Sequence, residues 1–154
     1  MDHSPISRGR PGIGLVALRD PRRARRREEL GVDSLWSLGH LTMGRAVNEP
    51  LSGLGVLAGA TERVAIGTAV TVIPLYHPVV VAKQVAEIDR ASGGRVIFGV
   101  GVGGEYPEEF AGVGVPLTER GPRTDEAISL MRSLWTGDRI DHSGRFWWIR
   151  GTAI

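Results

Sequence analysis

Four short apolar runs recur along the chain, and each is followed by a segment whose apolar residues keep helical spacing. The runs stay apolar throughout instead of alternating with polar residues, which predicts strands buried on both faces of a parallel sheet. The four predicted strands are Gly12–Leu18, Val32–Leu38, Val64–Val72 and Arg95–Gly103.

Proline and glycine mark the ends of the segments between these strands, as they do at the ends of helices. A first helix is predicted to follow Pro21 and to stop at Gly31. A second begins near Pro50, and a third has Pro78 in its first turn and ends at Gly93.

Beyond the fourth predicted strand the pattern changes. Pro107, Gly112 and Pro116 interrupt this part of the chain, so no helix is expected before about residue 119. A helix is then predicted over Glu119–Trp135, and the tail is expected to form a hairpin around Ser143-Gly144.

Strand–helix alternation repeated four times predicts an α/β fold with a parallel sheet and right-handed crossovers. Two architectures fit this order, a doubly wound sheet and a (β/α)8 barrel. A barrel needs about 200–250 residues or more, and the chain has 154. Its four units would therefore make half of a barrel. Residues 1–11 are expected to be a disordered tail, and residues 12–154 a single domain.

Composition excludes several kinds of site. The chain has no cysteine, so disulfides, thiolate metal sites and cysteine nucleophiles are excluded, and a reducing cytoplasm is the expected location. The histidines show no metal-ligand spacing with carboxylates, so no metal is expected. The stretch Val64–Ala82 has no charged residue, but Pro74 and Pro78 interrupt it. It is therefore interpreted as a strand, a loop and a helix, and not as a membrane span.

Arginine supplies almost all of the positive charge, because Lys83 is the only lysine. The densest cluster, Arg22–Arg27, has two interpretations: a nucleic-acid patch, or an exposed helix face that Glu28 and Glu29 partly neutralise. No aromatic residue lies among these arginines, and no nucleic-acid-binding motif accompanies them. We therefore expect an exposed helix face and no nucleic-acid partner.

Glycines crowd the end of the fourth predicted strand, where Gly99, Gly101 and Gly104 match the pattern G-x-G-x-x-G. A dinucleotide site places such glycines in the first β-α-β unit, directly before a helix. Here they follow the fourth strand, and nearby glutamates would repel a pyrophosphate. Two alternatives remain: glycines that let a flat ring approach a barrel mouth, or a tight turn without a ligand.

Four stretches between residues 28 and 148 resemble the bacterial luciferase-like monooxygenase family in their order and spacing. They are ELGVDSLW, TERVAIGTAVTVIPLYHPVVVAKQVAEIDRASGGRVIFGVGVGGEYPEEF, GVPLTERGPRTDEAISLMRSLWTG and HSGRFW. Members of this family are flavin- or deazaflavin-dependent oxidoreductases, some of which use coenzyme F420. The resemblance implies the N-terminal half of a (β/α)8 TIM barrel, with the cofactor ring across the carboxyl ends of strands two to four.

The resemblance also implies site residues. Many members end the second strand in an Asp-His pair, and this chain has Gly39-His40 there, so the histidine matches and the acid is missing. The implied catalytic residue is His40, and the alternative is an ordinary polar loop residue. Several members carry a non-prolyl cis peptide in the third strand, for which Ala69–Val70 is the candidate bond. The implied cofactor-binding residues are Ala69, Val70, Thr71, Gly101, Val102 and Gly103.

Two functions are open at this point. The first is an oxidoreductase, or a fragment of one, that transfers a hydride or activates oxygen on a small organic substrate. Its cofactor would be F420 or FMN, with F420 favoured because an arginine-rich, lysine-poor composition is typical of GC-rich genomes. The second is a non-catalytic half-barrel. Either would depend on a missing C-terminal half or form a homo-oligomer, since a half-barrel has open edges.

Overall fold

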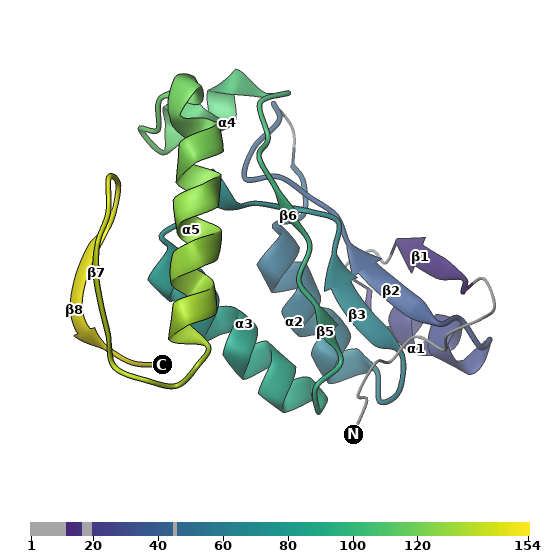
Figure 1. Ribbon diagram of the computed structural model, residues 1–154. Coiled ribbons are helices and arrows are strands. Elements are labelled where there is room, and N and C mark those ends of the chain that lie inside the picture. Colours follow the sequence, from purple (N-terminus) through teal and green to yellow (C-terminus); the bar gives the residue numbers. More distant parts are fainter. Residues whose placement is uncertain (1–11, 17–19, 45) are drawn as a thin grey trace.

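Four parallel strands form the main sheet of the protein (Figure 1), a computed structural model that describes residues 12–16, 20–44 and 46–154. Their order across the sheet is β1-β2-β3-β5, and all three pairings are parallel. The strands are β1 (Gly14–Val16), β2 (Ser34–Ser37), β3 (Ala65–Thr68) and β5 (Val96–Ile97). The predicted α/β fold with a parallel sheet is thus confirmed. The tail predicted at residues 1–11 lies outside the described residues.

The third and fourth predicted strands are each split into two, which corrects the continuous strands expected there. A second parallel pair, β4 (Thr71–Val72) and β6 (Val100–Gly101), continues the sheet beyond the break. At the break, the Thr68 hydroxyl donates to the Gly99 carbonyl (2.8 Å) and accepts from the Gly99 amide (3.0 Å). A side chain therefore takes the place of ladder hydrogen bonds. The peptide bond Ala69–Val70 within the break is cis, as predicted.

Three helices pack on one side of the sheet: α1 (Pro21–Glu29), α2 (Pro50–Ala60) and α3 (Pro78–Ser92). Leucines of α2 meet inward residues of β2 and β3 in a buried cluster that includes Leu35 and Ile66. A fourth long helix, α5 (Arg120–Leu134), packs on α3 and closes a second cluster around Leu130 and Met131. Two 3-10 turns, η1 (Ile73–Leu75) and η2 (Leu117–Glu119), complete the connections.

One short helix was not predicted. Helix α4 (Pro107–Gly112) occupies the segment in which proline and glycine were expected to exclude helix. Pro107 stands at its first position, where proline is tolerated, and Glu108 and Glu109 lie in its first turn, where acidic residues are favourable. Proline thus begins a helix here.

Strand β1 is exposed, although an apolar run was expected to be buried. Leu15 and Val16 of the strand are 37% and 44% exposed, and Ile13 directly before it is 62% exposed. The reason is its place at the edge of the sheet, since β2 is its only neighbour among the described strands.

Helix α1 presents its arginines to solvent, as expected, but its two glutamates have different partners. Glu29 pairs with Arg26 at 3.2 Å. Glu28 is buried and accepts hydrogen bonds from the backbone amides of residues 62–64 at 2.7–3.2 Å. Burial raises the pKa of Glu28, but these amides outweigh it and hold the pKa below its usual value. Glu28 therefore fixes α1 to the start of β3, whereas Glu29 forms an ion pair with an arginine of α1.

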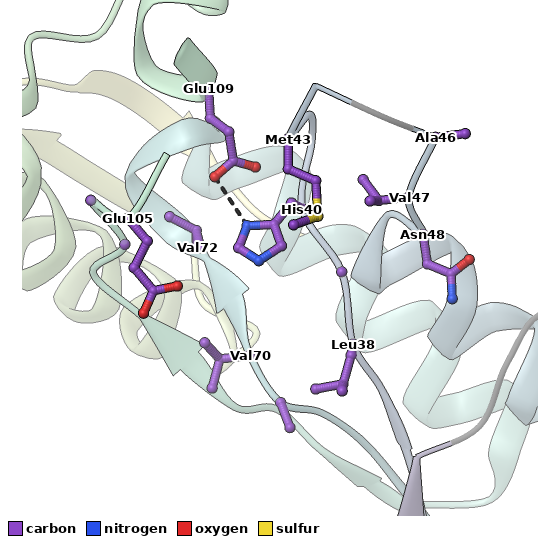
Figure 2. Close-up of a pocket in the computed structure, with 14 residues that line it drawn as sticks. Leu38, His40, Met43, Ala46, Val47, Asn48, Val70, Val72, Glu105 and Glu109 are labelled. Atoms are coloured by element: carbon purple, nitrogen blue, oxygen red, sulfur yellow. Dashed lines mark hydrogen bonds and ion pairs between the residues drawn. The ribbon is translucent and has the colours of Figure 1, made fainter. Parts of the chain in front are cut away.

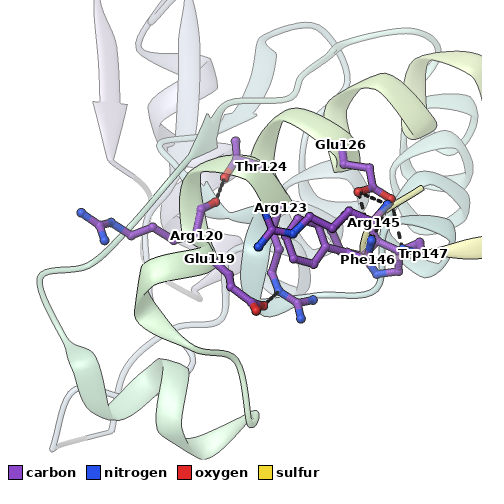
Figure 3. A network of polar contacts seen from close by, with 8 residues as sticks. All are labelled: Glu119, Arg120, Arg123, Thr124, Glu126, Arg145, Phe146 and Trp147. Carbon is purple, nitrogen blue, oxygen red and sulfur yellow. Dashed lines mark hydrogen bonds and ion pairs between the residues drawn. The ribbon is translucent and has the colours of Figure 1, made fainter.

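The tail forms the predicted hairpin, β7 (Ile140–Ser143) paired antiparallel with β8 (Trp148–Thr152). Figure 3 shows how Glu126 of α5 holds its turn. The carboxylate accepts from the amides of residues 145–147 at 3.0–3.2 Å, and His142 Nε2 lies 3.0 Å from it. Burial raises the pKa of Glu126, but His142 and these amides lower it below its usual value.

Two further kinds of feature are absent from the described part of the chain. No helix there is both long and apolar enough to cross a membrane. No group of three or more histidine, aspartate or glutamate side chains is arranged to hold a metal ion in the same residues.

Candidate functional site

A pocket of about 640 Å³ opens at the carboxyl ends of the strands (Figure 2). Three segments line it: the loop after β2, the junction between β3 and β4, and the segment from the end of β6 to α4. This is the end of a parallel sheet at which barrels and doubly wound folds bind ligands. The lining residues are Leu38, Gly39, His40, Met43, Ala46, Val47, Asn48, Ala69, Val70, Val72, Gly103, Gly104, Glu105 and Glu109.

His40 lies in this pocket with a carboxylate beside it. Its Nδ1 is 3.1 Å from Oε2 of Glu109, whose side chain is only 1% exposed. The Tyr106 ring meets the imidazole edge-on at a centroid distance of 4.7 Å. The acid that the sequence lacks before His40 is therefore supplied by α4. Sequence reasoning missed Glu109, because only the fold brings it next to a residue 69 positions earlier in the chain.

Glu109 also holds the loop that carries His40. Its Oε1 accepts from the backbone amides of Leu41 at 2.7 Å and Thr42 at 3.3 Å. The His40 amide donates to the Asn48 carbonyl at 2.9 Å, which closes the loop on itself. One buried carboxylate thus fixes both the imidazole and the backbone beside it.

The far end of the same loop is fixed by a second carboxylate. Glu49 caps α2 by accepting from the amides of Leu51 (3.0 Å) and Ser52 (2.7 Å), and it accepts from the Tyr76 hydroxyl at 2.9 Å. Burial raises the pKa of Glu49, but these hydrogen bonds bring it below its usual value. Burial and the nearby carboxylates of Glu49 and Glu109 raise the pKa of Tyr76, so its hydroxyl stays a donor.

The imidazole is arranged to handle a proton at one nitrogen. A carboxylate at Nδ1 favours the tautomer with a proton on Nδ1, which leaves Nε2 as the acceptor. No residue in the described part of the chain hydrogen-bonds to Nε2. His40 is 26% exposed, so a ligand in the pocket can reach it. A histidine held in this way can accept a proton at Nε2 and return it.

The structure places only some of the predicted site residues in the pocket wall. His40, Ala69, Val70 and Gly103 line it, and the Val70 side chain is 40% exposed. The other three predicted residues do not line it: Thr71 is fully buried in β4, Gly101 lies in β6, and Val102 is 41% exposed outside the pocket. The binding roles of all seven residues remain predictions.

The glycines at the end of β6 make room for neighbouring side chains of the protein, and whether they also contact a ligand remains a prediction. A Cβ added to Gly101 would lie 2.4 Å from Cγ2 of Val70, and one added to Gly103 would lie 2.4 Å from Cγ1 of Val72. Gly103 also has φ +68°. Glycine therefore lets β6 lie against β4 while Val70 and Val72 form the pocket wall.

This pocket suits a largely uncharged organic group. Its volume lies within the range of about 300–1,000 Å³ typical of small-molecule sites. Leu38, Met43, Val70 and Val72 give it apolar walls, and His40 is the polar group best placed to meet a reacting atom. The charged residues in its lining are Glu105 and Glu109, with no lysine or arginine among the residues described there.

The chain matches a known family model and is similar in sequence to characterised enzymes. A family model described as luciferase-like monooxygenase matches residues 9–154. An F420-dependent glucose-6-phosphate dehydrogenase of Microbacterium testaceum is 38% identical over 134 residues, which are 82% of this chain and 40% of that protein. A 4-hydroxyprotoasukamycin monooxygenase of Streptomyces nodosus subsp. asukaensis is 31% identical over 126 residues, 81% of this chain and 34% of that protein.

The chain is also similar to a solved structure. An F420-dependent secondary alcohol dehydrogenase, in complex with an F420-acetone adduct, superposes with a TM-score of 0.78 at 26% identity. The match covers 92% of this chain and 47% of that one. The chain thus spans less than half the length of the relatives it matches.

Proposed function

The chain belongs to the luciferase-like monooxygenase family, a family of oxidoreductases, and on this basis we propose that its pocket receives the ring of coenzyme F420 or FMN. In this proposal the chain is the N-terminal part of an enzyme that acts on a small organic substrate. The observation that carries it is the His40–Glu109 pair, which points a free ring nitrogen into a pocket with apolar walls. F420 is favoured, since relatives that match most of this chain are named as F420-dependent enzymes.

Each residue of the pocket has a separate part in the proposal. The bound ring would supply hydride transfer or oxygen activation. Ala69 and Val70 would support one side of the ring, and His40 would take up or return the substrate proton at Nε2. Glu109 would hold the imidazole in one orientation and in the tautomer that carries a proton on Nδ1.

Barrel completion is part of the same proposal. The described edges of the sheet, β1 on one side and β5 with β6 on the other, each have a neighbour on one side only. Apolar residues are exposed at the β1 edge. We propose that a C-terminal half, carried by further polypeptide or by a second copy, pairs with these edges and binds the cofactor phosphates. The cytoplasm remains the proposed location, because the chain has no cysteine.

The test is a fluorescence titration of the purified chain with F420 and, separately, with FMN. The chain offers a matched control, because His142 is paired with Glu126 at 3.0 Å but lies in the hairpin, away from the pocket. We expect saturable binding by the wild type and by His142→Asn, and binding weakened by about tenfold in His40→Asn, which corresponds to one lost hydrogen bond.

Other outcomes separate the two functions. A folded chain that binds neither cofactor would overturn cofactor binding by this half and favour the non-catalytic half-barrel. Equal losses in His40→Asn and His142→Asn would show that the effect comes from stability and not from the pocket.

A further inference from the structure

Gly39 lies just beyond the end of β2 and directly before His40, and it is part of the pocket lining. A Cβ added to Gly39 would lie 2.5 Å from the carbonyl carbon of Asn48 and nearer still to the carbonyl oxygen. Side chains do not approach backbone atoms this closely, so only glycine fits at this position. The requirement comes from space alone, because Gly39 does not have a positive φ.

The atom that fills the space beside Gly39 also holds His40. The His40 amide donates to the Asn48 carbonyl at 2.9 Å, and this carbonyl is the group that a side chain at position 39 would displace. His40 and Asn48 both line the pocket (Figure 2). The close approach of Asn48 to Gly39 therefore sets the position at which the chain carries the imidazole into the pocket.

Asn48 is held more firmly than the side chain of His40. Asn48 directly precedes Glu49, whose carboxylate accepts from two backbone amides of α2 and from the Tyr76 hydroxyl. The imidazole of His40 has a single hydrogen-bond partner in the described part of the chain, Glu109 at 3.1 Å. A side chain inserted at position 39 would therefore push His40 out of place before it moved Asn48.

We propose that Gly39 is the positioning residue of this pocket: it admits the Asn48 carbonyl, and this contact directs the His40 imidazole toward Glu109. An acidic residue at position 39 and the pairing of His40 with Glu109 are then mutually exclusive. An aspartate before His40 would cost the imidazole its buried acid and would not add a second one. The inference rests on the proposed function only in that His40 serves a bound ring.

The first test compares Gly39→Ala with Gly121→Ala, which adds the same methyl group at a position of α5 where no atom lies within 4 Å. The ring nitrogens of His40 are observed by nitrogen NMR at a pH at which imidazoles are neutral. In the wild type and in Gly121→Ala we expect the proton on Nδ1, the nitrogen beside Glu109. In Gly39→Ala we expect a mixture of the two tautomers of His40, with unchanged signals from His142.

Amide exchange gives a second measurement on the same contact. The His40 amide should exchange roughly threefold to tenfold faster in Gly39→Ala, because its acceptor is displaced, and the Ser52 amide should not change. A Gly39→Ala chain that keeps the Nδ1 proton and the slow exchange of His40 would overturn the proposal. So would a loss of thermal stability without any change at the imidazole, because that result indicates a purely structural glycine.

Tyr76→Phe tests the same contact from the other side, and it remains available if the alanine variant does not fold. It removes the hydroxyl that donates to Glu49 and thereby loosens the anchor of the Asn48 carbonyl. The His40 amide should then exchange roughly threefold to tenfold faster, while the Leu41 amide, whose acceptor belongs to α4, should not change. Equal acceleration at both amides, or none at His40, would contradict the proposal.

A cofactor titration links this contact to the proposed function. Gly39→Asp places an acid directly before His40, and we expect it to weaken binding of F420 or FMN by about tenfold, as loss of the imidazole contact would. Gly121→Ala should bind like the wild type. Binding by Gly39→Asp as tight as that of the wild type would overturn the proposal. If the wild type binds neither cofactor, the proposed function fails, and the NMR comparison still decides the role of Gly39.

Discussion

Glu109 is expected to order the loop beside His40, and its removal gives a quantitative test. The substitution Glu109→Ala removes the acceptor of the Leu41 and Thr42 amides. Hydrogen bonds to a charged group contribute about 1.5–3 kcal/mol. At about 1.4 kcal/mol per factor of ten, amide exchange at Leu41 should accelerate by roughly tenfold to a hundredfold.

The two amides should respond unequally. The Leu41 amide lies 2.7 Å from the carboxylate and the Thr42 amide 3.3 Å, so Leu41 should accelerate more. Glu109→Gln keeps a carbonyl acceptor without the charge, and a neutral hydrogen bond has about half the strength. Its acceleration at Leu41 should therefore fall between that of the wild type and that of Glu109→Ala.

The assay is hydrogen exchange followed by NMR at single amides. The Ser52 amide is an internal control, because Glu49 and not Glu109 accepts its hydrogen bond. Unchanged exchange at Leu41 in Glu109→Ala would refute the assigned role. Equal acceleration at Leu41 and Ser52 would show general destabilisation instead.

Three further outcomes are expected. Gly144→Ala should lower the free energy of unfolding by about 1–3 kcal/mol, measured by denaturant titration, because its Cβ would lie 1.9 Å from Oε1 of Glu126. The pKa values of Glu28 and Glu126 are lowered in the fold, so their stabilisation is present above the unfolded pKa and is lost as pH falls through the folded values. Glu126→Gln should therefore lessen the loss of thermal stability below about pH 4.5; an unchanged acid limb would contradict this. Gly101→Ala should displace Val70 and thereby weaken binding of the cofactor ring. Unchanged curves in the cofactor fluorescence titration would contradict a pocket wall formed by Val70.

Sequence patterns predicted those parts of the fold that depend on local spacing. Uniformly apolar runs indicated the parallel strands, and prolines and glycines indicated the helix ends. The hairpin was predicted by its turn residues. Where a side chain competes with the backbone, as Thr68 does at Gly99, the same patterns failed and a predicted strand was split.

The sequence by itself determined the family, the half-barrel order and the position of His40. The tertiary structure alone decided what surrounds that histidine. The residues next to His40 in the sequence could not show whether it has an acidic partner, because Glu109 belongs to α4 and lies near His40 only in the folded chain. Spacing along a chain encodes contacts within one element. A pair formed across elements depends on the path of every connection between them, which is why the pairing of His40 with Glu109 was visible only in the fold.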